Sequence, residues 1–242
     1  MRFSVIVCAY NEEQYLPGCL FSLLHQTRRP DEILVVNNAS TDGTRLAAER
    51  ASVRVVDESR KGLVIARETG STATTGDVLV YVDADCRAPR DWLERVAQEF
   101  EGLDPPVAVT GPYRFYDWDL IGRILVRIYD VTVAPVTHFL AQDVFEIGAI
   151  LYGGNFAVRR DALAAIGGFD TSIEFHGEDT NLGRRLSKVG RVQLILRCYV
   201  STSARRYKTL GTAAVFGLYV RNFCAELFLH RPSDKSHEDI RV

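Results

Sequence analysis

The sequence lacks the paired cysteines and glycine-rich loops that mark several large protein classes. Its five cysteines are odd in number and form no Cys-x-x-Cys pair, which excludes a zinc ribbon and a thioredoxin-type site. It contains no Gly-x-x-x-x-Gly-Lys, Gly-x-Gly-x-x-Gly, Gly-x-Ser-x-Gly or His-Glu-x-x-His motif. Phosphate-loop, dinucleotide, serine-hydrolase and zinc-protease chemistry are therefore not favoured. Scattered, unpaired thiols are typical of a reducing compartment, and we expect a cytoplasmic protein.

Neither an excess charge of one sign nor a long apolar run stands out. The 29 Lys and Arg residues nearly balance the 31 Asp and Glu residues, so no bulk charge draws the chain to nucleic acid. A membrane-spanning helix needs a run of about 20 apolar residues, and we find no such run in the sequence. The nearest run, residues 210–220, ends at Arg221. The apolar run at 5–9 is too short for a secretory signal, so we expect no leader.

Strand and helix signals alternate through the first half of the chain. Apolar, β-branched runs at 3–9, 33–36, 53–56, 78–82 and 107–110 are separated by helical spacings at 16–24, 44–51, 63–74 and 89–100. This alternation predicts an α/β fold with a mostly parallel sheet and helices on both faces. We expect Asn11 to cap the first helix, with Glu12 and Glu13 in its first turn. The second half indicates helices broken near Pro135 and a long helix at 209–229.

Polar residues follow the predicted strands where a parallel sheet binds its ligand. Two carboxylates, Asp83 and Asp85, come directly after the buried strand at 78–82. Two such carboxylates are costly unless a cation holds them, and hard oxygen ligands suit Mg²⁺ or Mn²⁺ shared with a diphosphate. The alternative is a pair of solvated loop carboxylates.

Several segments, taken in order, resemble family 2 glycosyltransferases over about residues 3–200. They are residues 4–13, 40–44, 76–85, Gly153-Gly154-Asn155, Arg159-Arg160-Asp161, 167–170 and Gly177-Glu178-Asp179. The resemblance implies a GT-A fold, a nucleotide-diphosphate sugar donor and inversion at the anomeric carbon. It also implies an acceptor hydroxyl on a glycan, a lipid-linked intermediate or a small molecule, and a role in cell-envelope polysaccharide synthesis.

The resemblance implies a donor site at the strand ends and on the helix near residue 63. Its residues are Ala9, Tyr10, Glu12, Asn37, Lys61, Arg67, Asp83, Ala84, Asp85, Gly154 and Glu178. Asp85 is the main metal ligand, and Asp83 contacts metal or ribose. Asn37 replaces a common Asp, which leaves the nucleotide base open. For Lys61 and Arg67 the alternative is an ordinary solvated helix face, and for Gly154 a plain turn.

Asp179 is the candidate general base, because inverting transfer needs one carboxylate to take the acceptor proton. Glu178 is the second candidate for that role. Without the resemblance, both would be read as charges that favour a helix N-terminus. His176 either completes a metal shell or is simply exposed.

We expect one GT-A domain over 1–230, with a nucleotide-sugar half (1–112), an acceptor half (113–230) and a polar tail (231–242). The Gln-x-x-Arg-Trp motif of processive members is absent, so transfer of a single sugar is expected. The helix at 209–229 either packs on the core or contacts a membrane surface, with Arg205 and Arg206 reaching donor diphosphate or an acidic headgroup. The rivals are a non-catalytic nucleotide-sugar binder and a sugar nucleotidyltransferase. A sugar nucleotidyltransferase would need a Gly-rich loop with a basic residue directly after the first strand.

Overall fold

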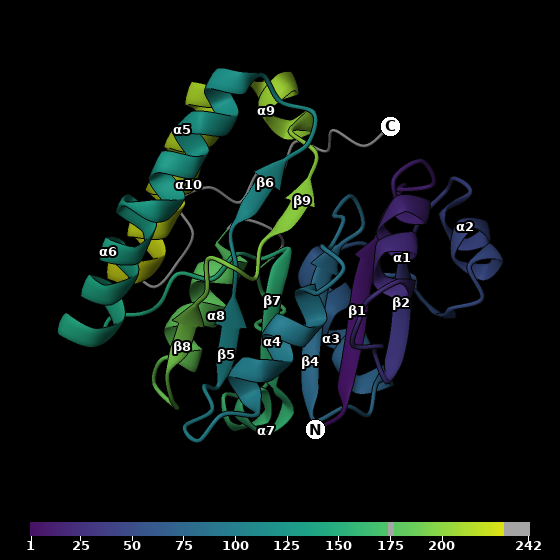
Figure 1. Ribbon diagram of the computed structural model, residues 1–242, viewed down its shortest axis with the longest axis horizontal. Helices are drawn as coiled ribbons and strands as arrows, with labels where there is room; N and C mark the ends of the chain where they lie inside the picture. The colour runs from purple at the N-terminus through teal and green to yellow at the C-terminus, as the bar shows by residue number, and fades with distance from the viewer. Residues whose placement is uncertain (174–176, 230–242) are drawn as a thin grey trace.

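A seven-stranded sheet forms the centre of the computed structural model, which describes residues 1–173 and 177–229 (Figure 1). The strand order is β3-β2-β1-β4-β7-β5-β8, and only β7 runs antiparallel to its neighbours. The strands are β1 (Phe3–Ala9), β2 (Glu32–Asn38), β3 (Arg54–Glu58), β4 (Val78–Asp83), β5 (Ala108–Thr110), β7 (Asn155–Arg159) and β8 (Val192–Leu194). The predicted mostly parallel sheet is confirmed.

Helices cover both faces of this sheet, as the sequence predicts. One face carries α1 (Leu16–Leu24), α2 (Thr44–Arg50) and α4 (Trp92–Phe100), and the other carries α3 (Leu63–Ala73), α7 (Arg160–Ala165) and α8 (Glu178–Leu186). Alternation along β1 explains the two layers, because Val5 and Val7 join the first core while Ile6 joins the second. Burial on both sides accounts for the continuous apolar composition of the central strands.

The reversed direction of β7 positions the site. In the register of the β4–β7 pair, Asn155 at the start of β7 lies opposite Val82 near the end of β4. Gly153 and Gly154 therefore meet the carboxyl end of β4, beside Asp83. A loop from the second half of the chain is thus brought to the strand ends of the first half.

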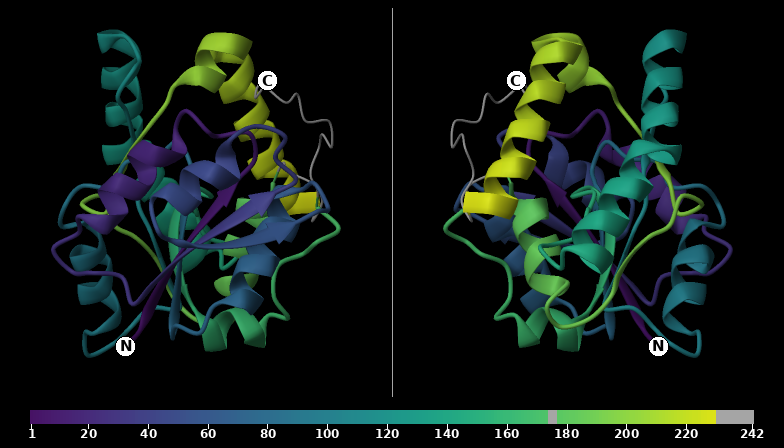
Figure 2. Two further views of the ribbon diagram at one scale, coloured as in Figure 1. Left: turned by 90° about the vertical axis from the view of Figure 1, so that its right-hand side faces the viewer. Right: turned by 90° about the vertical axis from the view of Figure 1, so that its left-hand side faces the viewer.

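A smaller layer lies above the carboxyl edge of the sheet (Figures 1 and 2). It contains a two-stranded parallel sheet of β6 (Tyr113–Phe115) and β9 (Val200–Thr202). Its helices are α5 (Leu120–Val131), α6 (Val133–Phe139), η1 (Leu140–Val144), α9 (Arg205–Leu210) and α10 (Thr212–Leu229). Figure 2 shows the start of α5 at one side of this layer, reaching about as high as α9.

The predicted capping role of Asn11 is wrong. Helix α1 begins at Leu16, and Asn11 has a left-handed backbone with φ of 50°. Its Oδ1 accepts a hydrogen bond from the backbone N of Thr41 at 2.9 Å, which ties the β1 loop to the β2 loop. A polar residue that a neighbouring loop holds in this way cannot begin the helix, and such strained residues cluster at ligand sites.

The expectation that no segment could span a membrane is also corrected. Residues Leu120–Val144 form 25 helical residues with a hydropathy of 1.4, long and apolar enough to cross a membrane by length and composition alone. Only 22% of that apolar window is buried inside the molecule. Arg123, Arg127 and Asp130 interrupt the segment, so a search for an unbroken apolar run misses it. The predicted tail, 231–242, lies outside the described residues.

Candidate functional site

Asp83 and Asp85 lie at the carboxyl end of β4 on a tight turn. The backbone N of Cys86 donates to the carbonyl oxygen of Asp83 at 2.9 Å, which closes this turn. Asp85 Oδ1 accepts from Thr202 Oγ1 on β9 at 3.1 Å, and its side chain is only 12% exposed. Burial raises the pKa of Asp85, Arg205 opposes this, and the charge of Asp83 adds to it. Because burial and a second negative charge both disfavour its ionised form, the Asp85 carboxylate is stabilised by a cation beside it.

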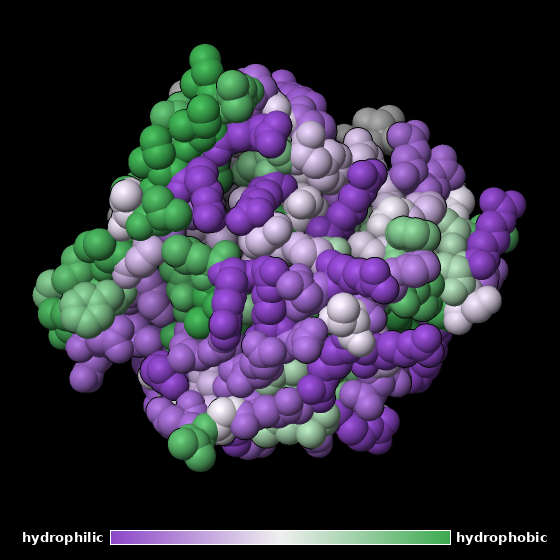
Figure 3. Space-filling view, viewed as in Figure 1, coloured by the Kyte–Doolittle hydropathy of each residue, from purple (hydrophilic) through white to green (hydrophobic). Residues whose placement is uncertain are grey.

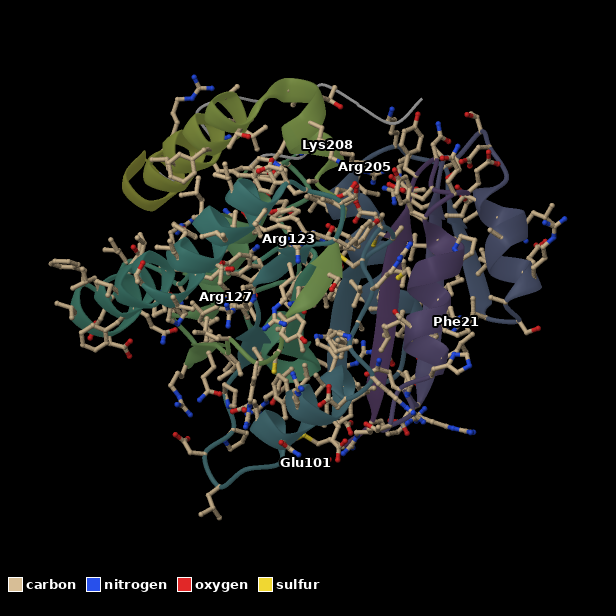
Figure 4. All side chains as sticks on the ribbon, turned by 45° about the horizontal axis from the view of Figure 1, so that its top comes forward. Phe21, Glu101, Arg123, Arg127, Arg205 and Lys208 are labelled. Carbon is tan, nitrogen blue, oxygen red and sulfur yellow. The ribbon has the colours of Figure 1, made fainter. Side chains whose placement is uncertain are left out.

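Arg205 supplies positive charge at this point. Its Nη2 lies 3.2 Å from Asp85 Oδ2, and its Nη1 donates to Glu12 Oε2 at 3.0 Å. Glu12 is 3% exposed, so the guanidinium neutralises a carboxylate that water barely reaches. Figure 4 shows Arg205 where α9 meets the ends of the central strands. The sequence predicts that Arg205 reaches donor diphosphate or an acidic headgroup, but not its contact with Asp85, from which 120 residues separate it.

The neighbouring strand ends form a second polar wall. Asn37 Nδ2 donates to Asp57 Oδ1 at 2.9 Å, while the Oδ1 atom of Asn37 is buried without a hydrogen-bond partner. The Lys61 ammonium lies 4.0 Å from the ring centre of Tyr10. Sequence reasoning missed Asp57, which the β2–β3 register places opposite Asn37. A carboxylate therefore stands beside the position where the resembled family has its Asp.

Two alanines of the predicted donor site lie among these polar groups. Ala9 at the end of β1 and Ala84 between the two aspartates are both buried, at 1% and 3% exposure. Both pack in the core cluster beneath the strand ends. Their methyl side chains thus contribute close packing beneath the polar groups.

Arg67 is buried, so the solvated helix face is wrong for this residue. It is 2% exposed on α3, its Nη1 donates to Glu178 Oε1 at 2.7 Å, and its Nη2 donates to the carbonyl oxygen of Gly153 at 2.7 Å. Both of these partners are groups of the protein itself. Arg67 holds the glycine turn and the start of α8 together.

The glycine turn lies between the two groups of carboxylates. A Cβ atom on Gly154 would lie 2.1 Å from Asp83 Oδ2 and 2.8 Å from the Tyr113 hydroxyl. A Cβ atom on Gly153 would lie 2.9 Å from Glu178 Oε1. A side chain at position 154 would therefore collide with Asp83, which favours glycine there, and the approach of this turn to a sugar stays a prediction.

Glu178 and Asp179 begin α8 on the far side of that turn. Burial raises the pKa of both carboxyl groups, and the charge of Arg67 opposes the rise for each. Asp179 Oδ1 accepts from the backbone N of Thr180 at 2.7 Å, whereas Glu178 pairs with Arg67. The charge of the adjacent Asp179 disfavours ionisation of Glu178, and the Arg67 guanidinium partly offsets this effect.

Replacing Gly154 with Ala is expected to lower activity by roughly a hundredfold, because the new methyl displaces the Asp83 carboxylate. Replacing Gly153 with Ala serves as the matched comparison and is expected to cost roughly tenfold or less, since its nearest contacts, Glu178 Oε1 at 2.9 Å and Arg67 Nη2 at 3.1 Å, are less close than that of Gly154 with Asp83. Donor turnover and melting temperature measured on both variants check this. Equal losses in the two variants would contradict the role given to Gly154.

The carboxylates at the end of β4 fit a divalent cation in part. Asp83 and Asp85 offer hard oxygen atoms of the kind that Mg²⁺ and Mn²⁺ bind. Among residues 1–173 and 177–229, no group of three or more His, Cys, Asp or Glu residues is arranged to hold a metal. The remaining ligands would have to come from water and a bound diphosphate, as is usual for Mg²⁺. His176 lies outside the described residues.

Comparison with known proteins identifies the family. The family model described as "Glycosyl transferase family 2" matches residues 4–167. "Glycosyltransferase AglE" of Haloferax volcanii is 34% identical over 195 residues, which cover 77% of this chain and 62% of that protein. The "Glucosyl-dolichyl phosphate glucuronosyltransferase" of the same organism is 27% identical, covering 74% and 59%. The chain thus spans about 60% of the length of these relatives.

A solved structure supports the fold. The "Mannosyltransferase PcManGT from Pyrobaculum calidifontis in complex with GDP-Man and Mn2+" aligns with a TM-score of 0.68 at 23% identity, covering 95% of this chain and 70% of that one. The seven-stranded sheet and its flanking helices match this GT-A architecture. Motifs, fold and family model agree, and the chain belongs to glycosyl transferase family 2.

Proposed function

We propose that the chain is an inverting, non-processive glycosyltransferase that moves a sugar from a nucleotide-diphosphate sugar to an acceptor hydroxyl. One observation carries this proposal. The Gly153-Gly154 turn places Asp83 on one side and the Glu178-Asp179 pair on the other, at the carboxyl edge of the sheet. A sugar seated at the turn would have the leaving diphosphate on the side of Asp83 and the acceptor on the side of Asp179.

The strand ends supply the donor contacts in this proposal. Asn37 Oδ1, buried and unpartnered, is available to a donor group on the nucleotide base. The ring of Tyr10 and the ammonium of Lys61 offer an apolar face and a cation beside it. Arg205 brings positive charge to the end of the diphosphate nearest Asp85. These contacts leave the identity of the nucleotide base open.

On the acceptor side, Asp179 takes the hydroxyl proton as the oxygen attacks the anomeric carbon. The bond to the diphosphate oxygen breaks on the opposite face, so the configuration inverts and no covalent sugar–protein intermediate is needed. Glu178 pairs with Arg67 and holds Asp179 and the glycine turn in place. A divalent cation on Asp83 and Asp85 would act as a Lewis acid on the departing diphosphate. The presence of Mn²⁺ beside GDP-Man in the Pyrobaculum complex supports this assignment.

The two rival functions have less support. A sugar nucleotidyltransferase would have a basic, glycine-rich loop after β1, whereas Asn11 and Glu12 follow β1 in this chain. A non-catalytic binder would not need the raised pKa values at Glu178 and Asp179, which raise the free energy of the folded state at neutral pH. The acceptor is proposed as a glycan, a lipid-linked intermediate or a small molecule. The proposed setting is cell-envelope polysaccharide synthesis in the cytoplasm.

A thermal-shift screen of nucleotide sugars with and without Mn²⁺ tests donor binding. We expect one nucleotide sugar to raise the melting temperature in the presence of Mn²⁺, because a ligand of the folded state alone stabilises it. The Asp85→Asn variant should lose the Mn²⁺-dependent part of the shift and keep a native melting curve. Asp104→Asn, on an exposed carboxylate, is the matched control. A full shift in Asp85→Asn would contradict the metal assignment.

A further inference from the structure

The helical segment α5–α6–η1 exposes many of its large apolar side chains to solvent. Eight of its apolar residues are 39–70% exposed and lie one to five positions apart, most often three: Ile121, Ile124, Leu125, Ile128, Val131, Val136, Phe139 and Leu140. We call these eight residues the apolar stripe. Figure 3 shows the apolar surface over α5 and α6. Contiguous apolar surface of this extent marks an interaction site.

The inward face of the same segment carries polar side chains that bond to the domain, beside the buried Ala134 and Ala141. Asp130 accepts from the Tyr152 hydroxyl at 2.8 Å, and His138 Nε2 lies 3.0 Å from the carbonyl oxygen of Val192. The backbone N of Val192 donates to Gln142 Oε1 at 2.8 Å. Turning the apolar stripe inward would break these buried bonds. They also hold the second half of the segment, from Asp130 to Gln142, against the domain, which favours a position in the plane of a membrane surface over a bilayer crossing.

Arginines gather beside the stripe. An open hollow of about 600 Å³ is lined by Arg95, Arg114, Arg127, Leu196, Arg197 and Tyr199. Arg127 belongs to α5 itself, one turn after Arg123, and Figure 4 shows these two reaching from the same side of that helix. Arg114 stacks on Tyr199, with its guanidinium 3.2 Å from the ring centre. A basic hollow next to an apolar stripe complements the two layers of an anionic membrane surface.

We propose that α5–α6–η1 is an in-plane membrane-binding element. The apolar stripe enters the headgroup–acyl boundary of an anionic bilayer, while the arginine hollow binds lipid phosphates beside it. The expected site of membrane contact thus moves from the helix at 209–229 to residues 120–144. Figure 1 shows α5 above the carboxyl edge of the sheet and α6 beside β8, so membrane binding would hold that edge close to the bilayer. The inference does not depend on the proposed reaction.

Vesicle flotation tests the proposal with the whole chain. We expect binding to phosphatidylcholine vesicles that contain phosphatidylglycerol, weaker binding in high salt, and little binding to phosphatidylcholine alone. Ile124→Glu with Ile128→Glu should lower binding by roughly tenfold or more, because two charges enter the apolar boundary. Arg114→Glu with Arg127→Glu should lower it by at least roughly tenfold and remove its salt dependence.

Phe21→Glu with Leu24→Glu is the matched control. These side chains are 64% and 44% exposed on α1, outside the apolar stripe, and binding should be unchanged. The substituted isoleucine, phenylalanine and leucine side chains are exposed, so we expect these variants to fold. The melting temperature of each variant checks its folding. Absence of binding by the wild-type chain, or full binding by the Ile124 and Ile128 variant, would overturn the proposal. So would a wild-type dimer that this variant dissociates, since a second copy would then cover the stripe.

Discussion

Replacing Asp179 with Asn should lower sugar transfer by roughly a thousandfold while leaving donor binding nearly unchanged. The reason is that a general base contributes about 10²- to 10⁴-fold and the amide cannot take the acceptor proton. Asn keeps the oxygen that accepts from the backbone N of Thr180, so the start of α8 is preserved. Initial rates at saturating donor, together with donor affinity from thermal shift, separate the two effects.

Glu178→Gln is the matched variant for that experiment. Glu178 is already engaged by Arg67 at 2.7 Å, so its loss should impair positioning and cost roughly tenfold to a hundredfold rather than a thousandfold. If Glu178→Gln instead abolishes transfer and Asp179→Asn is mild, the two roles are reversed.

The pH profile adds an independent readout. Burial raises the pKa of Asp179, so the protonated, inactive form persists to higher pH than for an ordinary aspartate. Activity should therefore fall as pH drops through that raised pKa. The same shift costs stability as pH rises above the unfolded value of 3.8, where the unfolded chain ionises first. Asp179→Asn should thus gain melting temperature relative to wild type at pH 8 and not at pH 3.

Replacing Arg67 with Ala should destabilise the fold by about 3 to 5 kcal/mol, because it breaks a buried ion pair and leaves the Glu178 carboxyl without its partner. The two side chains are 3% and 10% exposed, and the carbonyl oxygen of Gly153 loses its donor as well. Urea unfolding of wild type and variant measures the difference. Arg191→Ala, which breaks an exposed pair with Asp104, should cost less than about 1 kcal/mol.

A double variant separates the charge effect from a general loss of packing. Arg67→Met with Glu178→Gln removes both charges while keeping side-chain volume, and should recover most of the stability that Arg67→Ala loses. If the double variant is as unstable as Arg67→Ala, packing rather than the buried ion pair accounts for the loss.

The local patterns predict the scaffold of the site well. The buried run at 78–82 followed by two aspartates predicts β4 and its carboxylates, because strand period and turn chemistry are properties of neighbouring residues. The alternation of strands and helices likewise predicts the two-layered covering of the sheet. Each of these inferences concerns residues within about twenty positions of one another.

Features that depend on distant pairing could not be predicted in the same way. Arg205 reaches Glu12 and Asp85 only because β9 brings α9 over the sheet, and Asp57 supports Asn37 only through the β2–β3 register. The burial of Arg67 follows from α8 packing beside α3, which its own helix spacing does not reveal. Asn11 resembles a helix cap in sequence, yet the β2 loop holds it.

The apolar stripe illustrates a different limit. Residues 120–144 mix isoleucine and leucine with Arg123, Arg127 and Asp130, which is the composition of an ordinary amphipathic helix. Such a helix normally faces its apolar side to the core. Only the bonds of Asp130 and His138 to the domain show that this one faces outward.

The measurement that tests the central claim most directly is the stereochemistry of donor hydrolysis, with water as the acceptor. The donor is the nucleotide sugar that gives a Mn²⁺-dependent thermal shift, and NMR follows the first-formed sugar in wild type, Asp179→Asn and Asp85→Asn. The account predicts Mn²⁺-dependent release of the nucleoside diphosphate with the inverted anomer formed first, and rates reduced by roughly a hundredfold or more in both variants. Release of the retained anomer, or wild-type rates in both variants, would contradict it.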